Sequence, residues 1–165
     1  MANPKNDPRV SGIIEARELR GLMSEVQRLE AGAKAPEFSL PDQDGNTISL
    51  ANLKGQKAVL YFYPAAGSPG CTKEAADFQE ALGEFSKLGY RVIGISPDSV
   101  TRLKEFEDAH ELTFSLLSDP EVAAHKAFGA FGEKSLYGRL YKGTLRSTII
   151  INDSGVVEHA LYNVK

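Results

Sequence analysis

The chain has 165 residues, of which 42% are hydrophobic and 25% charged, and its net charge at pH 7 is −3. This size and composition predict one soluble globular domain with its own core, and the small negative charge argues against electrostatic binding of nucleic acid. No apolar run reaches the length of a membrane-spanning helix, one cysteine excludes an internal disulfide, and the N-terminus lacks the apolar segment of a signal peptide. We therefore expect a cytoplasmic protein that binds neither nucleic acid nor a membrane.

The N-terminal residues 1–28 are predicted to be an extension that precedes a domain formed by residues 29–165. Residues 1–11 are polar and contain proline, which is typical of a disordered segment or of a leader added to the protein. Residues 13–30 favour a helix, although Gly21 weakens it by about 1 kcal/mol relative to alanine. Their apolar side chains recur with helical spacing: Leu19, Leu22, Val26 and Leu29.

From residue 35 the chain alternates between predicted strands and helices. Alternating apolar residues on both sides of Asp44-Gly45-Asn46 predict a β-hairpin. The continuous apolar run Ala58–Tyr63 predicts a strand that is buried on both faces. A helix follows this strand and ends before Gly89. Its inward stripe comprises Ala75, Phe78, Leu82 and Phe85.

The middle of the chain continues this alternation. Strands are predicted at Val92–Ile95 and Phe114–Leu117, and a helix that begins at Ser99 separates them. The segment Asp119-Pro120-Glu121 offers an N-cap, a proline suited to the first helical position and an acid in the first turn. This combination predicts a third helix.

The last part of the chain completes the predicted fold. Gly129–Gly143 is rich in glycine and tyrosine and is predicted to be a loop. Ser147–Asn152 and Val156–Leu161 flank a turn sequence and predict a final hairpin. Strands and helices in this order indicate an α/β fold with a mixed sheet.

Cys71 is the only cysteine, and it lies where the first predicted helix of the domain begins. Ser68 suits the N-cap and Pro69 the first helical position. Cys71 then lies near unpaired backbone N–H groups and the positive end of the helix dipole, where a nucleophilic thiolate is stabilised. A lone cysteine is more often a small buried hydrophobe, but the surrounding turn favours a reactive sulfur.

The segment from Pro64 to Cys71 resembles the active-site motif of the peroxiredoxins, in which a proline is followed by a threonine or serine and then by the peroxidatic cysteine. The sequences YFYP and SPGCTKEAADF are similar to the bacterioferritin comigratory protein branch, also called peroxiredoxin Q. The resemblance covers residues 29–165 and implies a thioredoxin-like fold, with a central mixed β-sheet flanked by helices and an N-terminal β-hairpin. In this chain Ser68 replaces the usual threonine, and Ala76 stands where many members have a resolving cysteine.

The resemblance also implies a role for each candidate site residue. Cys71 would attack the O–O bond of a peroxide and become a sulfenic acid. Ser68 would direct its hydroxyl into the same pocket, in competition with its role as the N-cap, and Pro64 would wall that pocket. Arg146 would donate from its planar fork to the sulfur and the peroxide, and Glu74 corresponds to the acid that holds this arginine. From the sequence alone, Glu74 and Arg146 would be surface charges.

The ends of the chain leave alternatives open. Family members tend to open with a sequence like the one from Met23, and on that basis Val26–Leu29 is a short strand and not part of a helix. They also normally continue past Lys165 into a C-terminal helix. One face of the sheet is therefore expected to be covered by the N-terminal extension, to be buried against a second chain, or to be exposed by truncation.

The predicted function is thiol-dependent reduction of hydrogen peroxide and small organic hydroperoxides, without a cofactor or a metal. A one-Cys mechanism requires an external reductant, which would be thioredoxin, a glutaredoxin-like protein or a low-molecular-weight thiol. The protein is expected to be a monomer or a weak homodimer. The alternatives are a non-catalytic holdase and a thiol–disulfide oxidoreductase, although the latter lacks a Cys-x-x-Cys pair. The histidines are too widely spaced for a metal site, and the first two are expected to be solvated: His110, His125 and His159.

Overall fold

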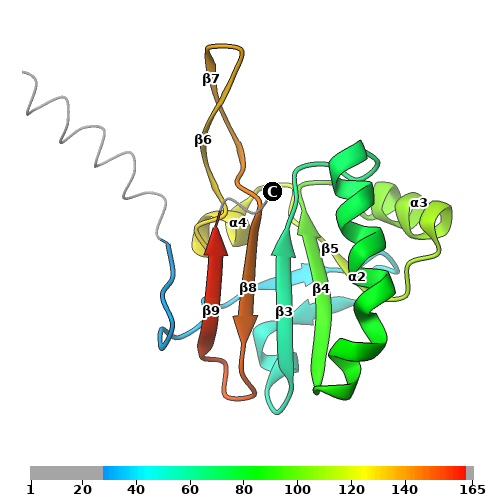
Figure 1. Ribbon diagram of the computed structural model, residues 1–165, viewed down its shortest axis with the longest axis vertical. Coiled ribbons are helices and arrows are strands. Elements are labelled where there is room, and N and C mark those ends of the chain that lie inside the picture. Colours follow the sequence, from blue (N-terminus) through cyan, green and yellow to red (C-terminus); the bar gives the residue numbers. More distant parts are fainter. Residues whose placement is uncertain (1–27, 163–165) are drawn as a thin grey trace, which may run out of the picture.

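A mixed five-stranded sheet forms the centre of the computed structural model, which describes residues 28–162 (Figure 1). In the sheet β3 pairs in parallel with β4 and β4 with β5, whereas β8 pairs antiparallel with both β3 and β9. This arrangement confirms the predicted mixed sheet, while the predictions for residues 1–27 lie outside the described part of the chain. The strands, in spatial order, are β5 (Ser115–Ser118), β4 (Tyr90–Ser96), β3 (Lys57–Phe62), β8 (Ser147–Ile151) and β9 (Val157–Tyr162).

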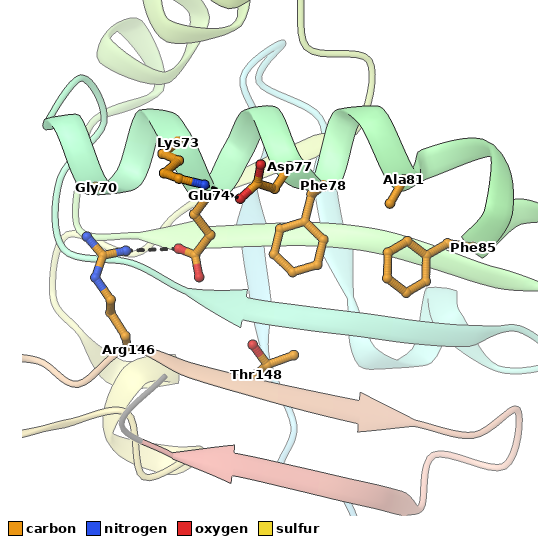
Figure 2. A pocket seen from close by; sticks show the side chains of 9 residues that line it. All are labelled: Gly70, Lys73, Glu74, Asp77, Phe78, Ala81, Phe85, Arg146 and Thr148. Carbon is orange, nitrogen blue, oxygen red and sulfur yellow. Dashed lines mark hydrogen bonds and ion pairs between the residues drawn. The ribbon is translucent and has the colours of Figure 1, made fainter. Parts of the chain in front are cut away.

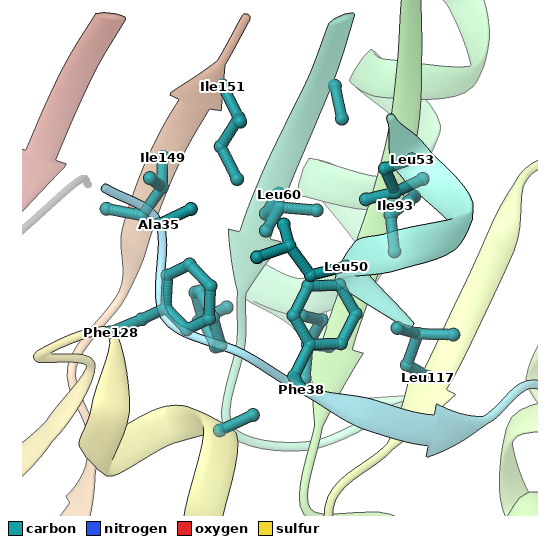
Figure 3. Packing of buried hydrophobic residues seen from close by; sticks show 14 of the residues in the cluster. Ala35, Phe38, Leu50, Leu53, Leu60, Ile93, Leu117, Phe128, Ile149 and Ile151 are labelled. Atoms are coloured by element: carbon teal, nitrogen blue, oxygen red, sulfur yellow. The ribbon is translucent and has the colours of Figure 1, made fainter. Parts of the chain in front are cut away.

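One face of the sheet is covered by the N-terminal part of the domain and by a short helix. The strands β1 (Ser39–Pro41) and β2 (Thr47–Ser49) form the predicted hairpin, and they are followed by the 3-10 helix η1 (Leu50–Leu53). These elements and α4 (Ala123–Ala127) enclose an apolar cluster against the sheet (Figure 3). Members of the cluster from distant parts of the chain include Phe38, Leu60, Ile93, Phe128 and Ile149.

Two helices cover part of the opposite face. Helix α2 (Pro69–Lys87) packs against β4, and α3 (Val100–His110) packs against β5. Among residues 28–162 no helix covers β8 and β9 on this face (Figure 1). No helix in this range is both long and apolar enough to cross a membrane.

Aromatic rings join α2 to the sheet. The ring of Tyr61 on β3 stacks on Phe78 of α2, with a centroid separation of 4.3 Å, and on Tyr63 at 5.3 Å. On the neighbouring strand a Cβ at Gly94 would lie 2.9 Å from the tyrosine ring, closer than real Cβ contacts. Glycine at this position therefore makes room for the stack.

The helix predicted to begin at Asp119 is absent at that position. Helix α4 begins four residues later, and its N-cap Val122 has a left-handed backbone and no side-chain cap. The Asp119 carboxylate instead accepts a hydrogen bond from the backbone N–H of His125 at 2.9 Å and lies 2.8 Å from its Nδ1. His125 is fully buried, so its predicted solvation was wrong, whereas His110 is exposed as expected. A local acid–histidine contact replaced the predicted cap.

The segment predicted to be a loop forms a second hairpin. Strand β6 (Phe131–Leu136) pairs antiparallel with β7 (Arg139–Thr144) and not with the central sheet. The two turn residues, Tyr137 and Gly138, have φ values of 52° and 78°. Positive φ at both central residues is the type I′ geometry that matches the twist of paired strands. The glycine at the turn was the signal that the prediction missed.

Candidate active site

The turn that precedes α2 places Cys71 at the start of that helix, as predicted. The Oγ of Ser68 accepts a hydrogen bond from the backbone N–H of Cys71 at 3.4 Å and donates one to the carbonyl of Ala65 at 3.0 Å. Ser68 is therefore the N-cap, and Pro69 occupies the first turn. Pro64 follows β3 and is half-buried. The sequence around Cys71 thus determines its position through local capping interactions.

A guanidinium joins the cysteine to an acid on the same helix. Arg146 lies directly before β8, and its Nη2 is 3.0 Å from the Sγ of Cys71. Its Nη1 donates to the Oε1 of Glu74 at 2.9 Å (Figure 2). A Cβ at Gly70 would lie 3.0 Å from the same Nη2. The glycine therefore lets the guanidinium come close to the first turn of α2.

The environment of this triplet is mostly closed to solvent. Cys71 is 1% exposed, and the side chains of Arg146 and Glu74 are 24% and 16% exposed. Burial raises the pKa of Glu74 above its ordinary value of 4.5, and the nearby Arg146 only partly opposes this rise. The charged carboxylate is thus held by the guanidinium in a site that otherwise favours the neutral acid.

The predicted site residues do not all contact the sulfur through their side chains. Cys71, Glu74 and Arg146 form one connected group through side-chain contacts. Ser68 reaches the backbone N–H of Cys71, which is its capping role. Its predicted contact with a substrate stays a prediction, as does the role of Pro64 as a wall.

Two residues that hold the turn were missed by sequence reasoning. The Oδ2 of Asp98 accepts a hydrogen bond from the backbone N–H of Ala66 at 2.7 Å and another from the hydroxyl of Ser96 at 2.8 Å. The Nη2 of Arg102, from α3, donates to the carbonyl of Ala66 at 3.2 Å. The signal available in the sequence was the polar turn that follows the predicted strand at Val92–Ile95, because parallel strands end at one edge of a sheet.

This geometry supports nucleophilic chemistry at sulfur. The thiolate is the nucleophilic form of cysteine, and a guanidinium at hydrogen-bond distance stabilises negative charge on the sulfur. Arginine offers its donors in a fixed fork, so Arg146 contacts Cys71 and Glu74 at the same time. Within residues 28–162 no group of three or more histidine, cysteine or acidic residues has the arrangement of a metal site.

The AhpC/TSA family matches residues 31–160 of the chain. A putative peroxiredoxin of Mycobacterium tuberculosis is 50% identical over 143 residues, which cover 87% of this chain and 91% of the relative. Peroxiredoxin Bcp of Escherichia coli is 42% identical over 137 residues, with 83% and 88% covered. A serine mutant of Xanthomonas campestris peroxiredoxin Q superimposes with a TM-score of 0.77 at 35% identity, covering 83% of this chain and 90% of that one.

The chain belongs to the AhpC/TSA family. Its relatives and structural neighbours include peroxiredoxins of the Bcp, or peroxiredoxin Q, branch, and its fold is the thioredoxin-like fold that the resemblance implied. The enzyme is a thiol-dependent peroxidase, whose substrate is a peroxide and whose reductant is a thiol.

Proposed function

We propose that Cys71 is the peroxidatic nucleophile of this enzyme. Its thiolate attacks one oxygen of the peroxide, the O–O bond breaks, and the other oxygen leaves as water or an alcohol after it takes up a proton. The sulfur is oxidised to a sulfenic acid and the peroxide is reduced. The observation that carries the proposal is the 3.0 Å contact between Cys71 Sγ and Arg146 Nη2.

The other candidate residues support this attack. Arg146 stabilises the thiolate and the negative charge that develops on the peroxide oxygens in the transition state. Glu74 fixes the guanidinium through its contact with Nη1, and is a positioning residue. Ser68 directs its hydroxyl, which now caps α2, to a peroxide oxygen when substrate is bound, and Pro64 keeps water from the sulfur.

The substrates are hydrogen peroxide and small organic hydroperoxides. A bacterioferritin comigratory protein of Xanthomonas campestris, 34% identical and with a TM-score of 0.75, is described by its alkyl peroxide reduction activity. A cysteine that is 1% exposed admits a small peroxide more readily than a bulky one. The same burial requires the first turn of α2 to open before a larger thiol reaches the sulfur.

The catalytic cycle is of the one-Cys type. The chain has no second cysteine, and the exposed Ala76 on α2 stands at the usual resolving position. An external thiol therefore attacks the sulfenic acid, forms a mixed disulfide with Cys71 and releases water, and a second thiol regenerates the enzyme. Until then a second peroxide oxidises the sulfenic acid to a sulfinic acid. The reductant is thioredoxin, a glutaredoxin-like protein or a low-molecular-weight thiol in the cytoplasm.

The peroxidase domain begins at residue 29. The backbone N–H of Leu29 donates to the hydroxyl of Tyr162 at 2.8 Å. The side chain of Leu29 packs against the apolar cluster beneath the sheet. These contacts support residues 29–165 as the catalytic domain and residues 1–28 as the extension.

The test measures peroxide consumption with dithiothreitol by the wild type and by Cys71→Ser. We expect the variant to be inactive, and intact-mass spectra of the oxidised wild type to show adducts of two and then three oxygens as peroxide increases. Activity in Cys71→Ser would refute the assignment of the nucleophile. A Cys71–Cys71 disulfide dimer as the main stable product would refute the external-thiol scheme alone, because the partner chain would then resolve the sulfenic acid.

A further inference from the structure

The hairpin of β6 and β7 extends from one end of the domain and points away from its body (Figure 1). Its distal half carries large apolar side chains in solvent. An isolated two-stranded hairpin is marginally stable in water, and a cluster of exposed apolar side chains marks an interaction site. The exposed fractions are 55% for Leu136, 97% for Tyr137, 69% for Leu140 and 43% for Tyr141.

The same hairpin is positively charged although the chain as a whole is negative. It carries one acid, Glu133, and three cationic residues, Lys134, Arg139 and Lys142. The Nζ of Lys134 lies 5.8 Å from the centre of the Tyr141 ring, so basic and aromatic groups share one face. The hairpin therefore suits a surface that is apolar at its centre and acidic at its margin.

A groove with a volume of about 530 Å³ lies between α2 and β8. The active-site residues Glu74 and Arg146, together with Lys73, line it towards the cysteine. Phe78, Ala81 and Phe85 point into it from α2, and Thr148 lies on the sheet side (Figure 2). A second hollow adjoins it along α2, where Leu88 is 67% exposed. The groove follows from the uncovered face of β8 and β9, because no helix among residues 28–162 fills the space beside α2.

Acidic side chains on α2 line the second hollow, at the end of the groove. Asp77, Glu80 and Glu84 recur at three- and four-residue spacing, which places them along one side of the helix. Asp77 is paired with Lys73 at 3.1 Å. Within residues 28–162, Glu80 and Glu84 have no cationic partner in an ion pair. Two carboxylates thus lie beside apolar surface at the end of the groove farther from the cysteine.

We propose that the β6–β7 hairpin of one chain docks in the α2–β8 groove of a second copy, and that the hairpin of the second copy docks in the groove of the first. The dimensions agree, since the distal three residues of each strand span about 10 Å and α2 rises about 10 Å between Phe78 and Phe85. The apolar tip lies on Phe78 and Phe85, and Arg139 meets Glu84. A two-fold axis makes both contacts identical and closes the assembly as a dimer.

The buried area is sufficient for a weak dimer. The register pairs Leu136 with Arg139 and Lys134 with Tyr141, so these side chains share one face of the hairpin, whereas Leu140 lies on the other. A tyrosine buries up to roughly 150–250 Å², and the reciprocal contact contains four tyrosines and two leucines from the two hairpin tips. Together with the groove surface they exceed the roughly 1,000 Å² that a specific interface needs. Because the interface is small and its margin is exposed, we expect a dissociation constant in the micromolar range.

Sedimentation velocity of the full chain from roughly 1 to 200 µM tests the association. The wild type is expected to shift from monomer to dimer, and the double variant Tyr137→Asn/Leu136→Ser to weaken the dimer at least about thirtyfold. Asparagine tolerates the left-handed backbone at position 137, so the hairpin keeps its turn. A wild type that stays monomeric throughout, or a double variant that dimerises equally well, refutes the proposal.

A charge exchange tests the pairing of the two surfaces. Arg139→Glu and Glu84→Lys should each weaken the dimer about three- to tenfold, because two-fold symmetry repeats each change. The two substitutions together should restore it. Glu105→Lys is the matched control, since it makes the same change at an exposed position on α3 and should leave the dimer unchanged. Failure of the double exchange to recover affinity contradicts the assigned contact.

A photo-reactive phenylalanine analogue at position 137 identifies the surface that the tip contacts. Mass spectrometry should locate the cross-link on α2 of another chain, within residues 77–88. Cross-links to any other segment, including residues 1–27, overturn the proposal. None of these measurements uses peroxidase activity, so their outcome is independent of the function assigned to Cys71.

Discussion

The substitution Arg146→Lys separates the charge of the site from its geometry. The guanidinium uses two nitrogens at once, with Nη2 3.0 Å from Cys71 Sγ and Nη1 2.9 Å from Glu74 Oε1. A lysine ammonium is a single compact charge on a flexible stem. It can bind the sulfur or the carboxylate, but it cannot reproduce both contacts in the fixed arrangement of the fork.

The expected loss follows from one missing charged hydrogen bond. Such a bond contributes about 1.5–3 kcal/mol, and 1.4 kcal/mol corresponds to a factor of about ten in rate. We therefore expect kcat/KM for hydrogen peroxide to fall roughly 10- to 150-fold in Arg146→Lys. Arg146 stabilises the charge that develops on the peroxide oxygens in the transition state. Because the lost interaction acts there, kcat should fall as well as kcat/KM.

The assay is stopped-flow peroxide reduction under single-turnover conditions, which isolates attack by Cys71 from the later thiol steps. Arg91→Lys is the matched control, because Arg91 donates to Ser115 Oγ at 2.8 Å near the opposite end of β4. This variant should react like the wild type. Equal rates for Arg146→Lys and the wild type would show that the fork does not act on the reacting atoms.

Three further outcomes follow from buried groups. Because burial raises the pKa of Glu74 above 4.5 more than Arg146 lowers it, the carboxylate takes up a proton early on acidification. The ratio of wild-type to Glu74→Gln activity should therefore decline towards one as the pH falls through that raised pKa. Burial also raises the pKa of Asp119, but hydrogen bonds from His125 outweigh it and hold the pKa below 3.8. The resulting stabilisation is present above pH 3.8 and is lost as the pH falls through the lower pKa of Asp119 in the folded protein. In urea unfolding, Asp119→Asn should therefore be about 1.5–3 kcal/mol less stable than the wild type at neutral pH. The difference should be smaller below pH 3.8. Gly94→Ala should cost about 1–3 kcal/mol in the same assay, because the added Cβ collides with a stacked tyrosine.

The parts of the fold that were predictable depend on local sequence. The strand predicted at Ala58–Tyr63 is observed at Lys57–Phe62, because burial on both faces gives an unbroken apolar run. The cap at Ser68 was predictable because capping uses neighbouring residues. The prediction at Asp119 failed for the opposite reason. The carboxylate of Asp119 could cap a local helix or bind the side chain of His125. The folded chain brings His125 within 2.8 Å of it, and this contact displaced the local cap.

The hairpin and the groove show a second limit of sequence reasoning. Alternation is a signal only where one face of a strand is buried, and most side chains between Glu133 and Lys142 are exposed. The stripe Phe78, Leu82 and Phe85 was predicted to face inward, and these side chains are only partly buried. Helical spacing gives the direction of an apolar face, but the neighbouring elements decide whether that face is covered.

The contact between Cys71 and Arg146, 75 residues apart, follows from the directions of three strands. Because β8 runs antiparallel to β3, its first residue, Ser147, pairs with Phe62 at the end of β3. The chain leaves β3 there for the cysteine turn, and Arg146 enters β8 at the same edge. Strand β4 runs parallel to β3, so its end brings Asp98 to this edge as well, where it binds the turn. With β8 in the parallel direction, Arg146 would lie at the opposite edge of the sheet. The strand order therefore assembles the site from segments whose local sequences carry no sign of one another.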